Sequence, residues 1–243
     1  MKLSGKVAIV TGSSKGIGRA IALLYAKEGA KVTVSARSRD QVEQVAEKIR
    51  ELGGEALAVQ ADVSSEVDVS RLVNTTFQTW GQIDILVNNA ATILPRINVE
   101  DIEPDQWRRV IDVNLTGSFL CARAVLPHMI KRKTGKIINI SSMGGRKGAR
   151  GRGPYCASKA ALINFTETLA AEAYDHGIDV NCICPGGVDT EMIRVTRGNQ
   201  ASGLMRPEEI AAVALFLASD ESSSITGTAI DAAGPSNKLF QID

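Results

Sequence analysis

Hydrophobic positions along this 243-residue chain form short runs that alternate with longer amphipathic stretches. The short runs are mostly apolar without strict alternation, which is typical of strands covered on both faces of a parallel sheet. The pattern predicts strands at Val7–Val10, Lys31–Ala36, Ala56–Ala61, Ile83–Asn88, Lys136–Ser141, Asp179–Cys184 and Thr228–Asp231. It predicts helices near 17–29, 39–52, 66–80, 104–131, 155–176 and 207–219. This alternation predicts an α/β fold: a single-domain, Rossmann-like, doubly wound parallel sheet of about seven strands with helices on both faces.

No low-complexity linker, internal repeat or composition break divides the chain, so residues 1–243 are expected to form one domain. The irregular segments 142–154 and 185–206 each follow a predicted strand. Ligands of open α/β sheets bind at the carboxyl ends of the strands. We therefore expect these loops to carry the function.

The first predicted strand ends in a glycine-rich turn, Thr11-Gly12-Ser13-Ser14-Lys15-Gly16-Ile17-Gly18, and a helical pattern follows. Glycines allow a tight turn and a close approach of the backbone to a pyrophosphate, and the helix N-terminus offers free N–H groups to the phosphates. No Gly-Lys-Ser/Thr closes the motif, so it is not a phosphate-transfer P-loop. The turn predicts a dinucleotide site whose contacts are Gly12, Ser14, Lys15, Gly16, Ile17 and Gly18.

The end of the second predicted strand indicates which dinucleotide binds. An acidic residue there selects NAD through the ribose 2′-hydroxyl, whereas this chain has Arg37, which suits a 2′-phosphate. Lys15 and the small hydroxyls of Ser14 and Ser38 favour the same choice. We predict that NADP(H) is preferred over NAD(H); the alternative is that Arg37 is a solvated loop residue.

Charge is neutral on average but strongly segregated. The formal net charge is +1, which argues against a nucleic-acid partner and against an anionic membrane. Residues 113–166 nevertheless contain ten Lys and Arg and no Asp or Glu, which leaves −9 on the rest of the chain. The loop at 146–152 is the densest part of this stretch. Two interpretations remain open: it binds an anionic substrate or carrier, or it is a solvated surface.

Composition excludes several classes of site. The chain has two histidines, His128 and His176, with no ligand set around either, so no metal site is predicted. Its four cysteines form no C-x-x-C pair, which is typical of reduced thiols in a cytoplasmic protein. No signal-peptide pattern and no apolar run of membrane-spanning length is evident. We expect a cytoplasmic protein with no membrane partner.

Tyr155 and Lys159 lie four residues apart in a helical pattern, which puts both on one face. A phenol with a pKa near 10 is a poor acid or base at neutral pH, and a neighbouring ammonium stabilises its phenolate. Tyr155 is then suited to protonate a carbonyl oxygen that receives hydride, or to deprotonate an alcohol in reverse. Ser142 follows the fifth predicted strand and is placed to hydrogen-bond the same oxygen.

Ordered motifs along nearly the whole chain resemble those of the short-chain dehydrogenase/reductase family, most closely its 3-oxoacyl-(acyl-carrier-protein) reductases. They are Thr11–Gly18, Asp62-Val63, Asn88-Asn89-Ala90, Asn114, Ser142, Tyr155-x-x-x-Lys159 and Pro185-Gly186. No single motif is specific, but the ordered set is.

The resemblance implies a role for each matched residue. It implies that Asn114, Ser142, Tyr155 and Lys159 are catalytic, with Lys159 also binding the nicotinamide ribose and Asn114 holding a water linked to Lys159. Asp62 and Val63 would contact adenine, and Asn89 and Ala90 would line the adenosine ribose. The remaining positions, expected at the carboxamide and phosphates, are Pro185, Gly186, Val188 and Thr190. Family members are commonly tetramers that pair the two long helices, so a homotetramer is expected.

Some positions depart from the family pattern. Ala91 stands where the family has Gly, and Ala232-Ala233 stands where it has Gly-Gly. The segment 190–207 is shorter than is common in acyl-carrier-protein reductases, and Asp175-His176 stands where those enzymes have a basic docking residue.

Three functions remain open on these residues. The first is NADPH-dependent reduction of a ketone or 3-oxoacyl thioester, on a small-molecule or carrier-bound substrate. The second is an alcohol, polyol or sugar-acid dehydrogenase that works oxidatively. A non-enzymatic nucleotide-sensing scaffold comes third, and it predicts loss of Tyr155 or Lys159, both of which are present.

Overall fold

Seven parallel strands form one sheet in the computed structural model, which describes residues 1–197 and 203–234. The strand order is β3-β2-β1-β4-β5-β6-β7. The strands are β1 (Val7–Thr11), β2 (Lys31–Ala36), β3 (Glu55–Gln60), β4 (Ile85–Asn88), β5 (Gly135–Ile140), β6 (Ile178–Pro185) and β7 (Ala229–Ala232). The parallel, doubly wound fold class is confirmed, and every predicted strand is present with shifts of a few residues at its ends.

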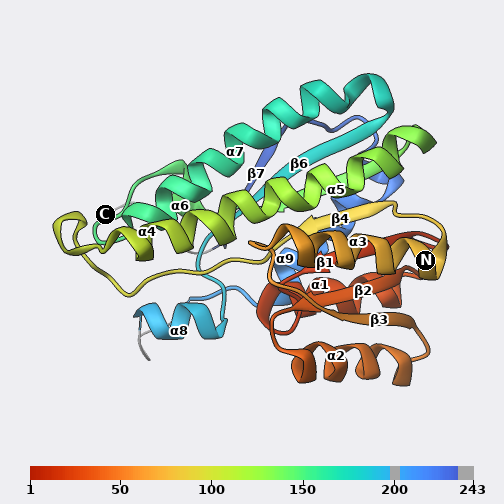
Figure 1. Ribbon diagram of the computed structural model, residues 1–243, viewed down its shortest axis with the longest axis horizontal. Helices are drawn as coiled ribbons and strands as arrows, with labels where there is room; N and C mark the ends of the chain where they lie inside the picture. Colours follow the sequence, from red (N-terminus) through yellow and green to blue (C-terminus); the bar gives the residue numbers. More distant parts are fainter. Residues whose placement is uncertain (198–202, 235–243) are drawn as a thin grey trace.

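Helices cover both faces of the sheet (Figure 1). One layer packs α1, α2 and α9 together, and the other contains α3, α5 and α7. Side chains alternate between the two layers along each strand: Ala8 and Val10 face the first, and Ile9 faces the second. The bounds are α1 (Gly16–Lys27), α2 (Arg39–Glu51), α3 (Glu66–Trp80), α5 (Gly117–Arg132), α7 (Gly153–Ala173) and α9 (Pro207–Ala218).

The helix predicted at 104–131 is present, with a change of hydrogen-bonding pattern inside it. It consists of α4 (Pro104–Ile111), a π-helical segment η2 (Asp112–Thr116) and α5, which run in line beside α7 (Figure 1). Asn114, in the middle of η2, is fully buried and bonds a loop outside the helix. Single π turns are common at functional sites because they redirect one side chain. Periodicity over 104–131 cannot detect such a turn, since one wider turn barely moves the apolar face.

The combined helical stretch Pro104–Arg132 is long and apolar enough, by length and composition alone, to cross a membrane. Core helices pass the same test, so this is weak evidence. In the structure α5 packs on α3, β4 and β5.

Each of the two segments predicted to be irregular, 142–154 and 185–206, contains a short helix. α6 (Met143–Arg146) follows β5, and Ser142 caps it by accepting a 3.0 Å hydrogen bond from the Gly144 N–H. α8 (Glu191–Arg197) follows β6 and lies apart from the helical layers in Figure 1. A parallel bridge between Val188 and Met205 joins the two sides of this second segment.

Candidate active site

The carboxyl ends of β1 and β4 meet in the middle of the sheet, where the strand order reverses direction. That reversal is the switch point at which doubly wound sheets bind ligands. The predicted site residues converge there from the ends of β1, β4, β5 and β6, together with the first turns of α1 and α7.

The glycine turn after β1 fits tightly under the end of β4. Gly12 has φ +62°, and a Cβ on it would lie 2.7 Å from the Ala90 Cα. A Cβ on Gly18 would lie 2.5 Å from the Gly12 carbonyl oxygen and would also overlap the Asn89 amide. Only glycine fits these positions, as the dinucleotide motif requires.

Asn89 holds this turn in place. Its side-chain amide donates to the carbonyl oxygens of Thr11 at 2.9 Å and Gly12 at 3.0 Å. The Thr11 hydroxyl in turn accepts from the backbone N–H groups of Asn89 and Ala90, at 3.1 and 3.2 Å. Asn89 therefore fixes the backbone of the glycine turn. The ribose contact that the resemblance implies stays a prediction.

The N-terminus of α1 is open to a ligand. Its capping residue, Lys15, has extended backbone, and its side chain makes no capping hydrogen bond. The first-turn N–H groups are therefore not occupied by the cap and can donate to a ligand. The Lys15 ammonium forms an ion pair with Glu191 at the start of α8. A Cβ on Gly16 would lie 3.1 Å from the Thr190 Cγ2, so Thr190 packs directly over the turn. The sequence predicts Lys15 beside a 2′-phosphate, and in this structure its ammonium pairs with Glu191.

Arg37 lies one residue past β2, exposed to solvent, with no ion pair to any residue that the structure describes. The Ser13 N–H donates to the Ser35 carbonyl at 3.0 Å, and the Ser13 hydroxyl accepts from the Ser35 N–H at 2.9 Å. These bonds hold the end of β2 against the glycine turn. The guanidinium is therefore available at the edge of the predicted nucleotide site.

Asp62, two residues past β3, is engaged within the protein. Its carboxylate accepts from Arg109 on α4 at 2.9 Å and from the Ser64 hydroxyl at 2.6 Å. Burial opposes ionisation of this group, but the hydrogen bonds from Ser64 and Arg109 outweigh it and lower the pKa of Asp62 to about 2. The neighbouring Val63 is buried against Gly117 at the start of α5. Sequence reasoning missed Arg109, because nothing local links it to a residue 47 positions earlier.

β6 ends at the same edge of the parallel sheet. Pro185 is the last residue of β6. The next residue, Gly186, donates its N–H to the Ala232 carbonyl on β7 at 3.0 Å. Val188 is buried, and the Thr190 hydroxyl donates to its carbonyl at 3.4 Å.

Ser142 and Tyr155 meet where β5 ends and α7 begins. A Cβ on Gly144 would lie 3.4 Å from both the Ser142 Oγ and the Tyr155 Cε1, so the two side chains lie close together, and Tyr155 is the third residue of α7. Burial raises the pKa of Tyr155, while the nearby Ser142 hydroxyl acts in the opposite direction. The net direction is opposite to the lowering that the Tyr-Lys spacing predicts. A buried phenol with a raised pKa keeps its proton at neutral pH.

Lys159 is buried one turn further along α7. Its ammonium donates to the Ile140 carbonyl at 2.7 Å and lies 6.0 Å from the centroid of the Tyr155 ring. Burial lowers the pKa of Lys159 to about 8. Gly145 makes this packing possible, because a Cβ there would lie 2.7 Å from the Lys159 carbonyl carbon. The i, i+4 spacing thus brings both side chains together, as predicted.

Asn114 connects this pair to the loop after β4. Its amide oxygen accepts from the Thr92 N–H at 2.8 Å, and its amide nitrogen donates to the Thr92 carbonyl and to the Ser158 hydroxyl, both at 3.0 Å. Ser158 and Thr92 were not predicted as site residues. Their only sequence signal is position: Ser158 directly precedes Lys159, and Thr92 lies two residues after the Asn-Asn-Ala motif.

Comparison with known proteins identifies the family. The sequence profile described as short chain dehydrogenase matches residues 6–201. The chain belongs to the short chain dehydrogenase family. It is therefore an NAD(P)-dependent oxidoreductase.

Curated relatives of this short chain dehydrogenase match it along nearly its full length. A 3-oxoacyl-[acyl-carrier-protein] reductase of Synechocystis is 42% identical, over 96% of this chain and 97% of that protein. Glucose 1-dehydrogenase 2 of Bacillus subtilis is 39% identical, over 94% of this chain and 93% of that protein. A crystal structure of a short-chain type dehydrogenase/reductase from Mycobacterium marinum superposes with a TM-score of 0.92 at 36% identity, covering 97% of each chain.

The basic stretch of this dehydrogenase is neutralised in part, by ion pairs of four of its ten cations. Four of its cations bond acids from elsewhere in the chain at 2.6–2.8 Å; the pairs are Arg123–Glu66, Arg132–Asp84, Lys136–Asp179 and Arg146–Asp231. Within the loop at 146–152, Arg146 also donates to the Ala229 carbonyl on β7, and Arg152 donates to the Leu94 carbonyl. Arg146 and Arg152 therefore hold the loop in place. In this structure they act neither as a substrate contact nor as a solvated surface, the two interpretations that the sequence leaves open.

The departures from the family pattern introduce no backbone strain. Among the described residues, the one non-glycine residue with positive φ is Lys133, so Ala91, Ala232 and Ala233 all adopt ordinary conformations. Within that same part of the chain, no group of three or more His, Cys, Asp or Glu side chains is arranged to hold a metal ion.

Proposed function

We propose that this short chain dehydrogenase is an NADPH-dependent reductase that converts a ketone or 3-oxoacyl thioester to a hydroxyl. The observation that carries the proposal is the convergence of Ser142, Tyr155 and Lys159 at the end of β5, beside the glycine turn of β1. A carbonyl placed there meets a hydroxyl donor, a proton donor and a buried cation.

The residues fit a nicotinamide dinucleotide. The space over Gly12 and Gly18 admits no Cβ, the first turn of α1 keeps its N–H donors, and the end of β2 carries an exposed arginine in place of an acid. When bound, the nicotinamide supplies the hydride. Arg37 would hold a 2′-phosphate, which supports NADP(H) over NAD(H).

In the proposed mechanism Tyr155 protonates the carbonyl oxygen and Ser142 orients that oxygen by a hydrogen bond. Burial raises the pKa of Tyr155, so the phenol is protonated at neutral pH and can serve as a proton donor. The Lys159 ammonium, with a pKa of about 8, is still charged at pH 7 and stabilises the phenolate left behind. Asn114 positions Ser158 and the loop at Thr92 on either side of this pair.

Oxidation of a polyol or sugar is the second candidate, favoured by the 39% identity to glucose 1-dehydrogenase 2. Turnover of NADPH and NAD⁺ against 3-oxoacyl thioesters, diketones, aldoses and sugar acids distinguishes the two. We expect NADPH-dependent reduction to exceed oxidation of any alcohol in the panel. Faster oxidation with NAD⁺ would favour the second candidate, and tight cofactor binding with no turnover would leave the scaffold function.

We also propose a cytoplasmic homotetramer. Trp107 on α4 and Phe119 and Ile130 on α5 are large apolar side chains that remain 37–44% exposed in the single chain. Pairing of these helices between subunits would cover them. Light scattering of the purified protein tests this: a monomer at micromolar concentration would contradict it.

A further inference from the structure

We infer that Arg96 and Arg150 form a subsite for a carboxylate on the substrate, remote from the reacting carbonyl. This inference rests on the proposed reductase function and narrows its substrate class to small oxo acids. It concerns a pocket that none of the predicted site residues lines.

The two arginines are brought together by loops from distant parts of the sequence. The Ile97 N–H donates to the Gly151 carbonyl at 3.2 Å, and Arg152 donates to the Leu94 carbonyl at 2.6 Å. Gly151 has φ +73°, and a Cβ on it would lie 3.2 Å from the Arg96 Cβ. The loop after β4 and the loop before α7 are therefore pinned to each other at this point.

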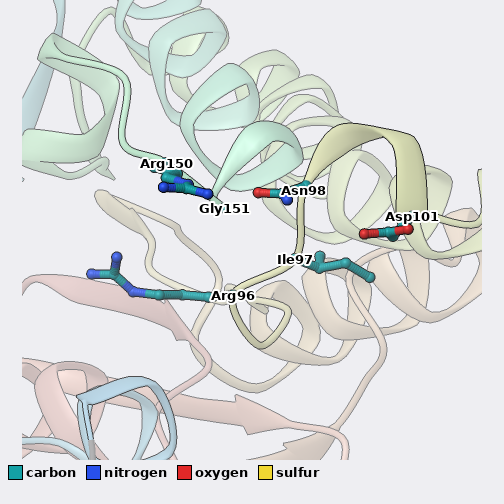
Figure 2. A pocket seen from close by; sticks show the side chains of 6 residues that line it. All are labelled: Arg96, Ile97, Asn98, Asp101, Arg150 and Gly151. Carbon is teal, nitrogen blue, oxygen red and sulfur yellow. The ribbon is translucent and has the colours of Figure 1, made fainter.

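A pocket of about 470 Å³ opens between these loops, lined by Arg96, Ile97, Asn98, Asp101, Arg150 and Gly151. Both guanidinium groups lie at one end of it and the Asp101 carboxylate lies at the other (Figure 2). Two cations opposite one anion leave an excess charge of +1. This balance suits a monoanion such as a carboxylate better than a phosphate dianion.

The pocket adjoins the predicted catalytic tyrosine. A narrower crevice, whose walls include Leu94, Pro154 and Tyr155, shares Ile97 and Gly151 with it. The crevice is closed to a water-sized molecule in this structure, so a substrate with its carbonyl at Tyr155 would reach the arginines only after the side chains that line the crevice move apart.

Neither of these arginines belongs to the four ion-paired cations of the basic stretch. Arg123, Arg132 and Arg146 each bond an acid, whereas Arg96 and Arg150 form no ion pair with any residue in the described ranges 1–197 and 203–234. Both are exposed at the mouth, where they are accessible to an incoming anion. Guanidinium groups bind carboxylates through paired hydrogen bonds, so two of them in one pocket favour such an end group.

The test compares matched substrates on the full-length enzyme with NADPH: 4-oxo and 5-oxo carboxylic acids against their methyl esters. For the wild type we expect a lower KM for the acids. Arg96→Gln and Arg150→Gln should each raise the acid KM by about 10-fold or more, with kcat and the ester kinetics nearly unchanged. Lys147→Gln is the matched control, since Lys147 is an exposed cation of the same loop that does not line the pocket. Equal KM values for acid and ester, or equal effects of all three substitutions, would overturn the inference.

The outcomes separate this inference from the proposed function and from another source of the anion. Absence of NADPH turnover on every carbonyl rejects the reductase itself, whereas turnover of esters without preference for acids rejects the subsite alone. A coenzyme A thioester and its phosphate-free N-acetylcysteamine analogue complete the panel. If the two substitutions raise the KM for the coenzyme A thioester alone, the subsite binds a carrier phosphate and the carboxylate assignment is wrong.

Discussion

Tyr155 illustrates how the environment of one residue changes its pKa. The phenol is buried against Ser142, and its pKa is raised rather than lowered in the protein chain. A protonated phenol next to a charged Lys159 is prepared to give up a proton once an oxygen beside it becomes basic. The i, i+4 spacing identifies the pair, whereas the direction of the pKa shift depends on burial in the fold.

Tyr155→Phe should lower kcat by about two to four orders of magnitude, because it removes the proton donor and little else. The dissociation constant for NADPH should change little, which fluorescence titration measures. Tyr174→Phe is the control, since Tyr174 is 68% exposed on the surface. Unchanged turnover in Tyr155→Phe would remove this residue from the mechanism.

Arg37 is the single residue on which the cofactor preference depends. Arg37→Asp should shift the ratio of kcat/KM for NADPH over NADH by about 10- to 100-fold towards NADH, since a charge-assisted contact is lost and an acid is gained. Lys27→Asp makes the same charge change on an exposed residue at the far end of α1 and should leave the ratio unaltered. Equal ratios in all three proteins would show that Arg37 is only a solvated residue.

Among the elements, the turn between β1 and α1 is the most tightly constrained. Asn89, from the loop after β4, bonds two of its carbonyls, and no space remains for a Cβ at Gly12 or Gly18. The glycine spacing predicts this turn, but the clamp from β4 emerges only when the two strands lie side by side.

Gly18→Ala should raise the NADPH dissociation constant by about 10-fold or more, because the added methyl displaces the Asn89 amide and the Gly12 carbonyl. Isothermal titration calorimetry measures the change. Gly148→Ala serves as control, since nothing lies within 4 Å of a Cβ built on Gly148. An unchanged affinity in Gly18→Ala would mean that the phosphates do not approach this backbone.

In the whole molecule, ion pairs join cations and acids that lie far apart along the sequence, so the charges are less segregated in space than in the chain. Acids from β3, β4, β6 and β7 and their neighbouring loops reach cations of other elements, as in Asp84–Arg132 and Lys136–Asp179. The Asp62–Arg109 pair belongs to this group, and it links the predicted adenine contact to α4.

Arg109→Gln should destabilise the protein by about 0.5–1 kcal/mol at pH 7, a value discounted for partial solvent exposure of the pair. Because the pKa of Asp62 is lowered to about 2 in the fold, its stabilising contribution is complete above its unfolded pKa of about 4. That contribution is lost as pH falls from about 5 towards 2. Urea unfolding across this range should show the difference between wild type and variant shrink with acidity; a constant difference would contradict the assigned cause.

The sequence by itself determines the sheet, its helices and the chemistry-bearing positions. Buried runs and amphipathic periods are local patterns, so the strands, the glycine turn and the Tyr155–Lys159 spacing are visible without coordinates. The resemblance to a known family adds Asn114 and the residues after β3, β4 and β6.

Only the tertiary structure decides which of these groups meet. The hydrogen bonds of Asn114 to Thr92, the ion pairs of Lys15 and Arg109, and the juxtaposition of Arg96 with Arg150 all join residues far apart in sequence. Such contacts depend on how helices and loops pack on the sheet, which no local period encodes. The same reason applies to charge: ten cations without an acid form one block along the chain, yet packing pairs four of them with acids and leaves Arg150 beside Arg96 at the mouth of a pocket.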